Sequence, residues 1–324
     1  MTDTGPLFVS SGDLIADRRY KWALDLAARG DFAGAADVLV QTVALAPGFA
    51  TAWFALGAIR DRLGDRPGAI TAFEKTRDAD PEDYHGARLQ LARLGSGDDT
   101  PAMTQTYVRR LFDQYATRFD TALTERLAYR GPGLLREAVE RVMITAGRPF
   151  HFGAMLDLGC GTGLGAAPFR PVVDRLVGVD LSPAMVAQAE AKAIYDQLAA
   201  ADLTTFLADQ SAGGAKYDLV LAADVFVYVN DLAPVIAAVA RVLAEGGAVA
   251  FTVETHADDG VKLLPTLRYA FGESYVRRVL AEAGFTVVHL AKAAVRSEKG
   301  APVDSLVVVA QLSATARAPA RPEP

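Results

Sequence analysis

The sequence predicts an α/β protein in which a mostly parallel sheet follows a small all-α domain. Two observations lead to this prediction. An apolar run from Phe152 to Leu158 ends in three glycines at alternate positions, which is typical of a strand that leads into a tight, ligand-binding turn before a helix. The first hundred residues carry a helical pattern in which Gly30-Asp31 recurs 34 residues later as Gly64-Asp65.

Length and composition limit the possible classes of protein. With 324 residues, 51% hydrophobic and 22% charged, the chain can form two globular domains. Its 33 basic and 39 acidic residues give a net charge of −6, and no compact basic tract is present, so we expect no nucleic-acid partner. One cysteine excludes a disulfide framework and a cysteine-rich zinc site, and no metal is expected. No leader or membrane-spanning run is apparent, which favours a cytoplasmic protein without a membrane segment.

Residues 1–99 are predicted to form a helical repeat domain. In the second copy, Gly57 and Ala69 are small where two helices should cross closely, and large residues fill the space beside them. The period and pattern resemble the tetratricopeptide repeat. A third helix at about residues 82–94 is expected to cap the pair. The residues that carry the pattern are Trp53, Leu56, Gly57, Ala69, Phe73 and Pro81, and, one repeat earlier, Trp22, Ala23, Ala35, Leu39 and Pro47.

The glycine-rich segment after the apolar run is the most informative part of the chain. Asp157-Leu158-Gly159-Cys160-Gly161-Thr162-Gly163 puts a carboxylate ahead of three glycines. Glycine permits a sharp turn and lets a ligand approach the backbone closely, and the carboxylate favours an ammonium group over a pyrophosphate. The segment resembles the first motif of the Rossmann-like, class I S-adenosylmethionine-dependent methyltransferases.

A second part of that family's pattern follows in register. The strand expected at Val172 to Val179 ends in Asp180, 23 residues after Asp157. In the family a carboxylate at this position accepts the ribose hydroxyls of the cofactor. Ser182 can cap the next helix, with Pro183 at its first position.

The remaining motifs complete the predicted domain. A third strand at about residues 196–200 leads to Asp202, and the segment from Tyr217 to Val225 resembles the family's fourth-strand motif. The resemblance implies a Rossmann-like, seven-stranded and mostly parallel sheet with helices on both faces. This methyltransferase domain is expected at residues 146–312, and a disordered tail at 313–324.

Residues 100–145 are predicted to hold a lid helix and linker helices. Gly95 to Pro101 is rich in glycine and predicts a linker. In the segment from Thr106 to Asp120, aromatic residues recur at helical spacing, which is the ordinary sign of core packing. Small-molecule methyltransferases carry a similar segment over the cofactor, so the resemblance favours a lid. Gly131-Pro132-Gly133 should separate it from a helix at residues 134–145.

The implied cofactor is S-adenosyl-L-methionine. Asp157 is expected near its ammonium group, Asp180 at its ribose and Asp202 at its adenine. Cys160 is expected to be a small buried residue and not a nucleophile, because the sequence places no histidine beside it. The expected cofactor-binding residues are Asp157, Gly159, Cys160, Gly161, Gly163, Asp180, Leu181, Met185, Asp202, Leu203, Asp224, Tyr107, Tyr115 and Phe119.

The catalytic and acceptor residues are less defined by the sequence. Tyr228 occupies the place of a histidine in several small-molecule O-methyltransferases, and His256 follows the likely fifth strand, so both are candidate bases. Arg268 and Tyr269 are candidates for anchoring an anionic acceptor. We expect methylation of a small molecule at a hydroxyl or carboxyl oxygen. A protein methyltransferase that recruits its substrate through the repeats, a self-associating platform, and a non-catalytic cofactor-binding protein remain alternatives.

Overall fold

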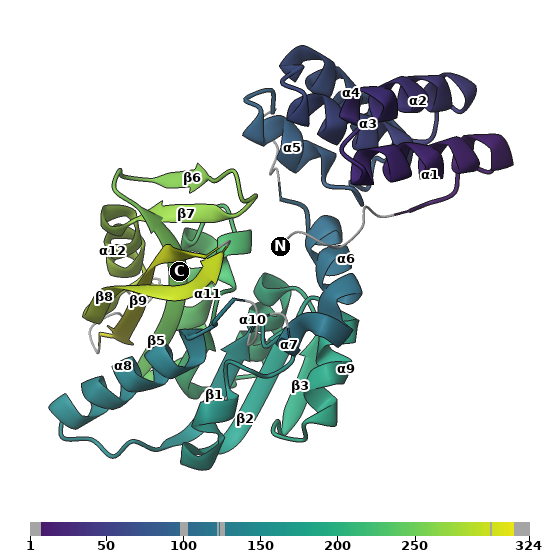
Figure 1. Cartoon of the computed structure of the whole chain (residues 1–324). Coiled ribbons are helices and arrows are strands. Elements are labelled where there is room, and N and C mark those ends of the chain that lie inside the picture. Colours follow the sequence, from purple (N-terminus) through teal and green to yellow (C-terminus); the bar gives the residue numbers. More distant parts are fainter. Residues whose placement is uncertain (1–7, 98–102, 122, 124–126, 299, 314–324) are drawn as a thin grey trace, which may run out of the picture. The chain divides into compact units, whose positions relative to one another are not determined.

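The computed structural model describes residues 8–97, 103–121, 123, 127–298 and 300–313 (Figure 1). The chain forms two compact units. The helical unit comprises residues 1–110 with 263–267, and the sheet unit comprises 111–262 with 268–324. Linker residues 98–101 and the tail from residue 314 lie outside the described residues. The division falls within helix α6, Gln105–Tyr115.

The described part of the helical unit contains two helical hairpins followed by a short helix. Gly30 and Gly64 have φ of +86° and +82°, a conformation that favours glycine and ends the first helix of each hairpin. Asp31 and Asp65 then cap the second helices by accepting the backbone N–H of Gly34 and Gly68, respectively. The helices are α1 Leu14–Ala28, α2 Phe32–Leu45, α3 Ala50–Arg62, α4 Arg66–Ala79 and α5 Ala87–Arg93.

The hairpin core follows the predicted pattern with one exception. A Cβ at Gly57 would lie 2.7 Å from the Phe73 ring, so α3 and α4 cross closely at the expected small residue. Trp22, however, is 54% exposed, and Tyr20 is the large side chain of α1 that is buried. Helix α5 is also shorter than the predicted helix at 82–94, because the chain turns at Gly86, whose φ is +75°.

Among the described residues, one sheet of nine strands organises the sheet unit, where seven strands were predicted. Strands β3, β2, β1, β4 and β5 are parallel and adjacent in this order, β9 is antiparallel to β5, and β8 is antiparallel to β9. The two additional strands are short, and β7 pairs with the end of β5. The strands are β1 Phe152–Leu158, β2 Val173–Asp180, β3 Gln197–Ala200, β4 Tyr217–Ala222, β5 Leu243–His256, β6 Val261–Leu263, β7 Tyr269–Gly272, β8 Phe285–Glu298 and β9 Ala301–Leu312.

Helices cover both faces of the sheet, as predicted (Figure 1). Helix α8 packs Leu135, Val139 and Met143 against a buried cluster that includes Met155 and Leu219. The alternate strand residues, such as Leu156, point to the opposite face and are also fully buried. The helices of the sheet unit are α7 Phe119–Thr121, α8 Gly131–Thr145, α9 Pro183–Ala191, α10 Leu203–Ala212, α11 Ala233–Val242 and α12 Glu273–Glu282.

Two helix predictions need correction. Helix α8 begins at Gly131, so Gly131-Pro132-Gly133 forms its first turn and does not separate it from the preceding segment. Pro132 is tolerated there because the first helical N–H groups have no intrahelical partner. After the glycine turn the chain forms only a 3₁₀ helix, Ala167–Val172, which contains Pro171. A proline inside a helix removes a hydrogen-bond donor, which explains why no longer helix forms.

Candidate cofactor and methyl-transfer site

The turn after β1 has the backbone that its three glycines predict. Gly159, Gly161 and Gly163 have φ of +61°, +52° and +92°. Side chains rarely adopt this left-handed region, and a Cβ at Gly159 would also lie 2.6 Å from Val225. Glycine is therefore required at this turn by the backbone conformation, and at Gly159 by the closeness of Val225 as well.

Asp180 at the end of β2 is bonded to this turn. Its Oδ2 accepts the backbone N–H of Gly161 at 2.8 Å, and its Oδ1 accepts that of Ser182 at 2.8 Å. Burial raises the pKa of Asp180, although both hydrogen bonds favour the carboxylate. Each carboxylate oxygen has a second lone pair, so Asp180 can still accept a hydroxyl from each side of a ribose.

Asp157, the carboxylate ahead of the glycines, has a partner that the sequence reasoning missed. Its Oδ2 accepts the hydroxyl of Tyr195 at 2.7 Å. Burial raises the pKa of Asp157 to about 7, the Tyr195 hydrogen bond opposes this shift, and Asp180 adds to it. Cys160 is buried beside these acids, and burial raises the pKa of its thiol well above the ordinary value. Its prediction as an inert buried residue is consistent with this environment.

The segment from residue 111 to 121 is attached to the turn and to α9 through two aspartates. Asp113 accepts the Ser182 hydroxyl at 2.5 Å and the Ala184 backbone N–H at 3.3 Å. Asp120 accepts the hydroxyl of Thr162 and an N–H of Lys192. The sequence prediction singled out the aromatic stripe of this segment and missed its acids, since Asp residues on a helix are usually solvated.

Some aromatic residues of this segment lie at the turn. Phe119 comes within 3.7 Å of the position that a Cβ on Gly161 would occupy. Tyr115 packs on Phe119 with ring centroids 6.2 Å apart, and Phe112 packs on Tyr228 at 5.1 Å. These contacts bring the predicted lid residues Tyr115 and Phe119 to the glycine turn.

Tyr107 is placed differently from Tyr115 and Phe119. It belongs to the helical unit, where its ring occupies the space beside Gly86, so that a Cβ at Gly86 would lie 2.6 Å away. Burial raises the pKa of Tyr107, and the nearby Asp83 adds to this shift. Tyr107 thus belongs to the helical unit, and its predicted contact with the cofactor stays a prediction.

The residues predicted to contact the adenine differ in burial and in hydrogen bonding. Met185 is fully buried. Asp202 caps α10, because its Oδ1 accepts the backbone N–H groups of Thr204 and Thr205, both at 3.0 Å. Leu203 is the first residue of that helix. Asp202 therefore has a structural role at the end of β3, and its contact with adenine stays a prediction, as does that of Leu181.

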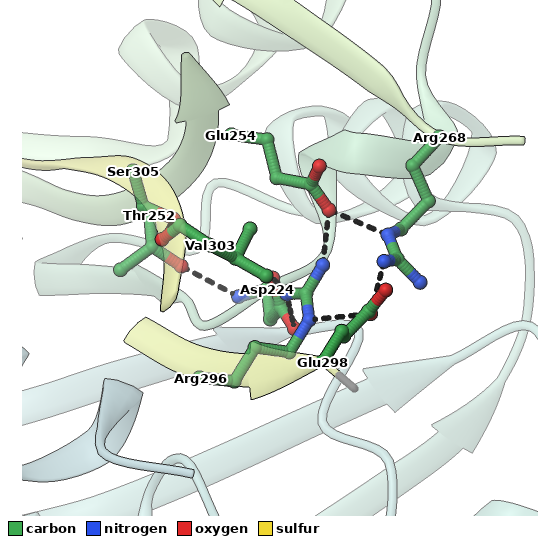
Figure 2. A network of polar contacts seen from close by, with 8 residues as sticks. All are labelled: Asp224, Thr252, Glu254, Arg268, Arg296, Glu298, Val303 and Ser305. Atoms are coloured by element: carbon green, nitrogen blue, oxygen red, sulfur yellow. Dashed lines mark hydrogen bonds and ion pairs between the residues drawn. The ribbon is translucent and has the colours of Figure 1, made fainter. Parts of the chain in front are cut away.

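A network of charged side chains, most of them buried, lies at the carboxyl ends of β4 and β5 (Figure 2). Arg296 of β8 contacts both carboxylate oxygens of Asp224, which follows β4, and also contacts Glu254 of β5. Arg268 contacts Glu254, with Nε 2.5 Å from Oε1, and Glu298. Burial opposes the charge of Arg296, but Asp224 and Glu254 outweigh it and raise its pKa.

This network changes the interpretation of Arg268. Its side chain is only 3% exposed, and two carboxylates of the chain already balance its charge. The network holds three carboxylates and two guanidinium groups, and the more exposed members are Asp224 and Glu298, at 20% and 17%. An anionic acceptor would therefore meet carboxylates here, which argues against the predicted anchoring role. Tyr269, the other predicted anchor, is buried in β7.

The two candidate bases differ in their surroundings. Tyr228 lies in the turn after β4, against Phe112, and is an electrostatic neighbour of both Arg268 and Arg296. His256 ends β5, where both ring nitrogens are shielded from solvent and have no hydrogen-bond partner among the described residues. A base must reach the proton it removes, so the position of Tyr228 suits the role better.

Comparison with known proteins agrees with this architecture. Residues 156–251 match the family model described as methyltransferase domain. The human methyltransferase-like protein 27 is 36% identical over 104 residues, which are 32% of this chain and 40% of that protein. The match thus spans well under half of the human relative.

Solved structures show the same fold. The Burkholderia thailandensis 1,6-didemethyltoxoflavin-N1-methyltransferase, with 1,6-didemethyltoxoflavin and S-adenosylhomocysteine bound, aligns with a TM-score of 0.50 and 19% identity over 67% of this chain and 93% of its own. The strand order and the family match together give the sheet unit the Rossmann-like fold of the class I S-adenosylmethionine-dependent methyltransferases. Within the described residues, no helix is long and apolar enough to cross a membrane, and no cluster of metal-ligating side chains occurs.

Proposed function

We propose that this protein is an S-adenosyl-L-methionine-dependent methyltransferase that methylates a small molecule at a hydroxyl oxygen. The observation that carries the proposal is the hydrogen bond from the Gly161 backbone to Asp180. This bond holds the glycine turn beside the carboxylate that is proposed to bind the ribose. A glycine turn that served only to connect β1 to the next element would not need this bond.

The cofactor supplies the electrophile, since its sulfonium activates the methyl group. The chain has to bind, orient and shield it. The backbone from Gly159 to Gly163 would hold the methionine part, Asp157 its ammonium group and Asp180 its ribose. Phe119 and Tyr115 would cover the turn and exclude water.

The charge of the network in Figure 2 favours a hydroxyl acceptor over a carboxylate. One carboxylate is in excess over the guanidinium groups, and carboxylates are its more exposed members. A neutral acceptor avoids this repulsion. A hydroxyl needs a base, and we assign that role to Tyr228, which follows β4 and neighbours both arginines of the network.

The helical unit is proposed to be a tetratricopeptide-like platform. Its hairpin turns at Gly30-Asp31 and Gly64-Asp65 support this assignment. Two hairpins offer a short surface, so a role in stability or self-association is favoured over recruitment of a polypeptide acceptor.

A methyl-transfer assay with isotope-labelled cofactor tests the proposal. The full chain would be incubated with fractionated small molecules, before and after their carboxyl groups are blocked, and with the protein fraction of the same extract. We expect label in small molecules whether or not carboxyls are blocked. Label confined to protein would support the polypeptide-acceptor alternative, and label that disappears on blocking would show a carboxyl acceptor.

A further inference from the structure

A glycine in the strand next to Asp157 leaves space on one face of the sheet for the side chain of Tyr195. In the strand register, Asp157 of β1 lies beside Gly178 of β2, which lies beside Leu198 of β3. Residues paired in this way direct their side chains to the same face of the sheet, and the middle one has no side chain. A Cβ at Gly178 would lie 2.7 Å from the Tyr195 ring. The glycine thus allows that ring to reach across β2.

The Tyr195 ring fills the space between this glycine and the cofactor turn. On the turn side, a Cβ at Gly163 would lie 3.1 Å from the ring. The hydroxyl then donates to Oδ2 of Asp157 at 2.7 Å, and Asp157 itself is 1% exposed. Two glycines from different elements therefore make room for one tyrosine whose only polar atom meets the buried carboxyl.

We propose that Tyr195 is a positioning residue for cofactor binding: its hydrogen bond orients the buried Asp157 carboxyl and favours its ionised form, which pairs with the ammonium group of S-adenosylmethionine. This inference rests on the proposed function and extends it to a residue outside the family motifs found in the sequence.

The other groups around Asp157 do not favour its ionised form, so the hydrogen bond from Tyr195 matters. Burial raises the pKa of Asp157 to about 7, and the negative charge of Asp180 raises it as well, whereas the Tyr195 hydrogen bond lowers it. Cys160 and Tyr129 also neighbour this carboxyl, and burial raises the pKa of both, so they carry no charge near pH 7. Among these described neighbours, Tyr195 is the group that favours the carboxylate before a cationic ligand arrives.

Two ligands, one with the ammonium group and one without it, can distinguish this role of Tyr195 from a role in packing. S-adenosylhomocysteine carries the ammonium group, and 5′-methylthioadenosine retains the adenosine and thioether without the amino-acid part. Both would be titrated by calorimetry into the full chain and into Tyr195→Phe between about pH 6.5 and 8.5. We expect Tyr195→Phe to bind S-adenosylhomocysteine about tenfold more weakly at pH 7. The loss should shrink as the pH rises, because Asp157 then ionises without the tyrosine. Binding of 5′-methylthioadenosine should not change.

Control variants define the other outcomes. Tyr217→Phe removes a hydroxyl bonded to Gln210 at 2.6 Å elsewhere in the sheet unit and should leave both affinities unchanged. Asp157→Asn should bind S-adenosylhomocysteine weakly at every pH. If Tyr195→Phe weakened binding of both ligands equally at all pH values, Tyr195 would be a packing residue only. If its loss of S-adenosylhomocysteine affinity did not change with pH, the inference would be overturned. Failure of the unmodified protein to bind S-adenosylhomocysteine would instead contradict the proposed function.

Discussion

The Asp180 carboxylate accepts the Gly161 backbone N–H at 2.8 Å, and this bond joins the end of β2 to the middle of the glycine turn. The same carboxylate accepts the Ser182 N–H ahead of α9. One side chain thus fixes two backbone segments that converge where the cofactor is proposed to bind. Loss of this carboxylate should affect both binding and the shape of the turn.

Asp180→Ala should weaken binding of S-adenosylhomocysteine by tenfold or more, since charge-assisted hydrogen bonds are each worth roughly 1.5 to 3 kcal/mol. Asp180→Asn retains one acceptor oxygen and should lose less. Calorimetry on both variants measures the difference. Asp174→Asn, which changes an exposed carboxylate at the other end of β2, is the matched control. Equal affinity in Asp180→Ala and the unmodified protein would refute the ribose assignment.

Asp113 and Asp120 should hold the segment from residue 111 to 121 on the glycine turn. We expect Asp113→Asn with Asp120→Asn to speed hydrogen exchange in this segment, because each change weakens a hydrogen bond to Ser182 or Thr162. Added S-adenosylhomocysteine should slow exchange there in the unmodified protein. Exchange that is indifferent to both the substitutions and the ligand would mean that the aromatic stripe is ordinary packing and no lid.

Arg296→Met should destabilise the sheet unit strongly, by about 3 to 5 kcal/mol, because it leaves three carboxylates of the network with Arg268 as their one guanidinium partner. Adding Glu254→Met to this variant should recover part of the loss. Urea unfolding of the single and double variants provides the test. A double variant whose stability equals the sum of both single losses would show that the two side chains do not depend on each other.

Asp83→Asn should stabilise the helical unit above about pH 6. Burial raises the pKa of Asp83 from 3.8 to about 6, and its Oδ2 has no hydrogen-bond partner among the described residues. A raised carboxyl pKa means that stability falls as the pH rises from about 4 to 6, and the amide variant should escape this fall. Asparagine also tolerates the φ of +56° at this position.

Denaturation followed at pH 4 and pH 8 measures the effect of Asp83→Asn. The variant should gain about 1 kcal/mol on the unmodified protein at pH 8 and close to nothing at pH 4. A larger gain in stability at pH 4 than at pH 8 would contradict the view that Asp83 ionises in a buried position.

The features that could be predicted from the sequence are those set by backbone conformation and by the order of residues along one strand and turn. Gly159, Gly161 and Gly163 reveal their turn because few other residues adopt its dihedral angles, and Asp180 follows from its position at a strand end. Tyr195 could not be assigned in this way, since its partner Asp157 is reached across Gly178, and only strand register brings them together. A glycine within an apolar strand is nevertheless a signal of close approach, and Gly178 offered one.

Arg268 and Tyr107 have surroundings that the sequence did not predict, for related physical reasons. Arg268 was a candidate for anchoring an anionic acceptor, but Glu254 of β5 and Glu298 of β8 pair with it. Tyr107 belongs to the same aromatic stripe as Tyr115, yet the chain divides into two units between them. Neither the pairing nor the division can be read from spacing along the sequence.

Calorimetric titration of S-adenosylhomocysteine into the full chain and into Gly161→Val tests the central claim most directly. The unmodified protein should bind one molecule per chain. Gly161→Val should not bind, because a side chain would be forced into a backbone with φ of +52°, at the surface that the cofactor must approach. A folded Gly161→Val with full affinity, or an unmodified protein with none, would contradict the assignment of this turn as the cofactor site.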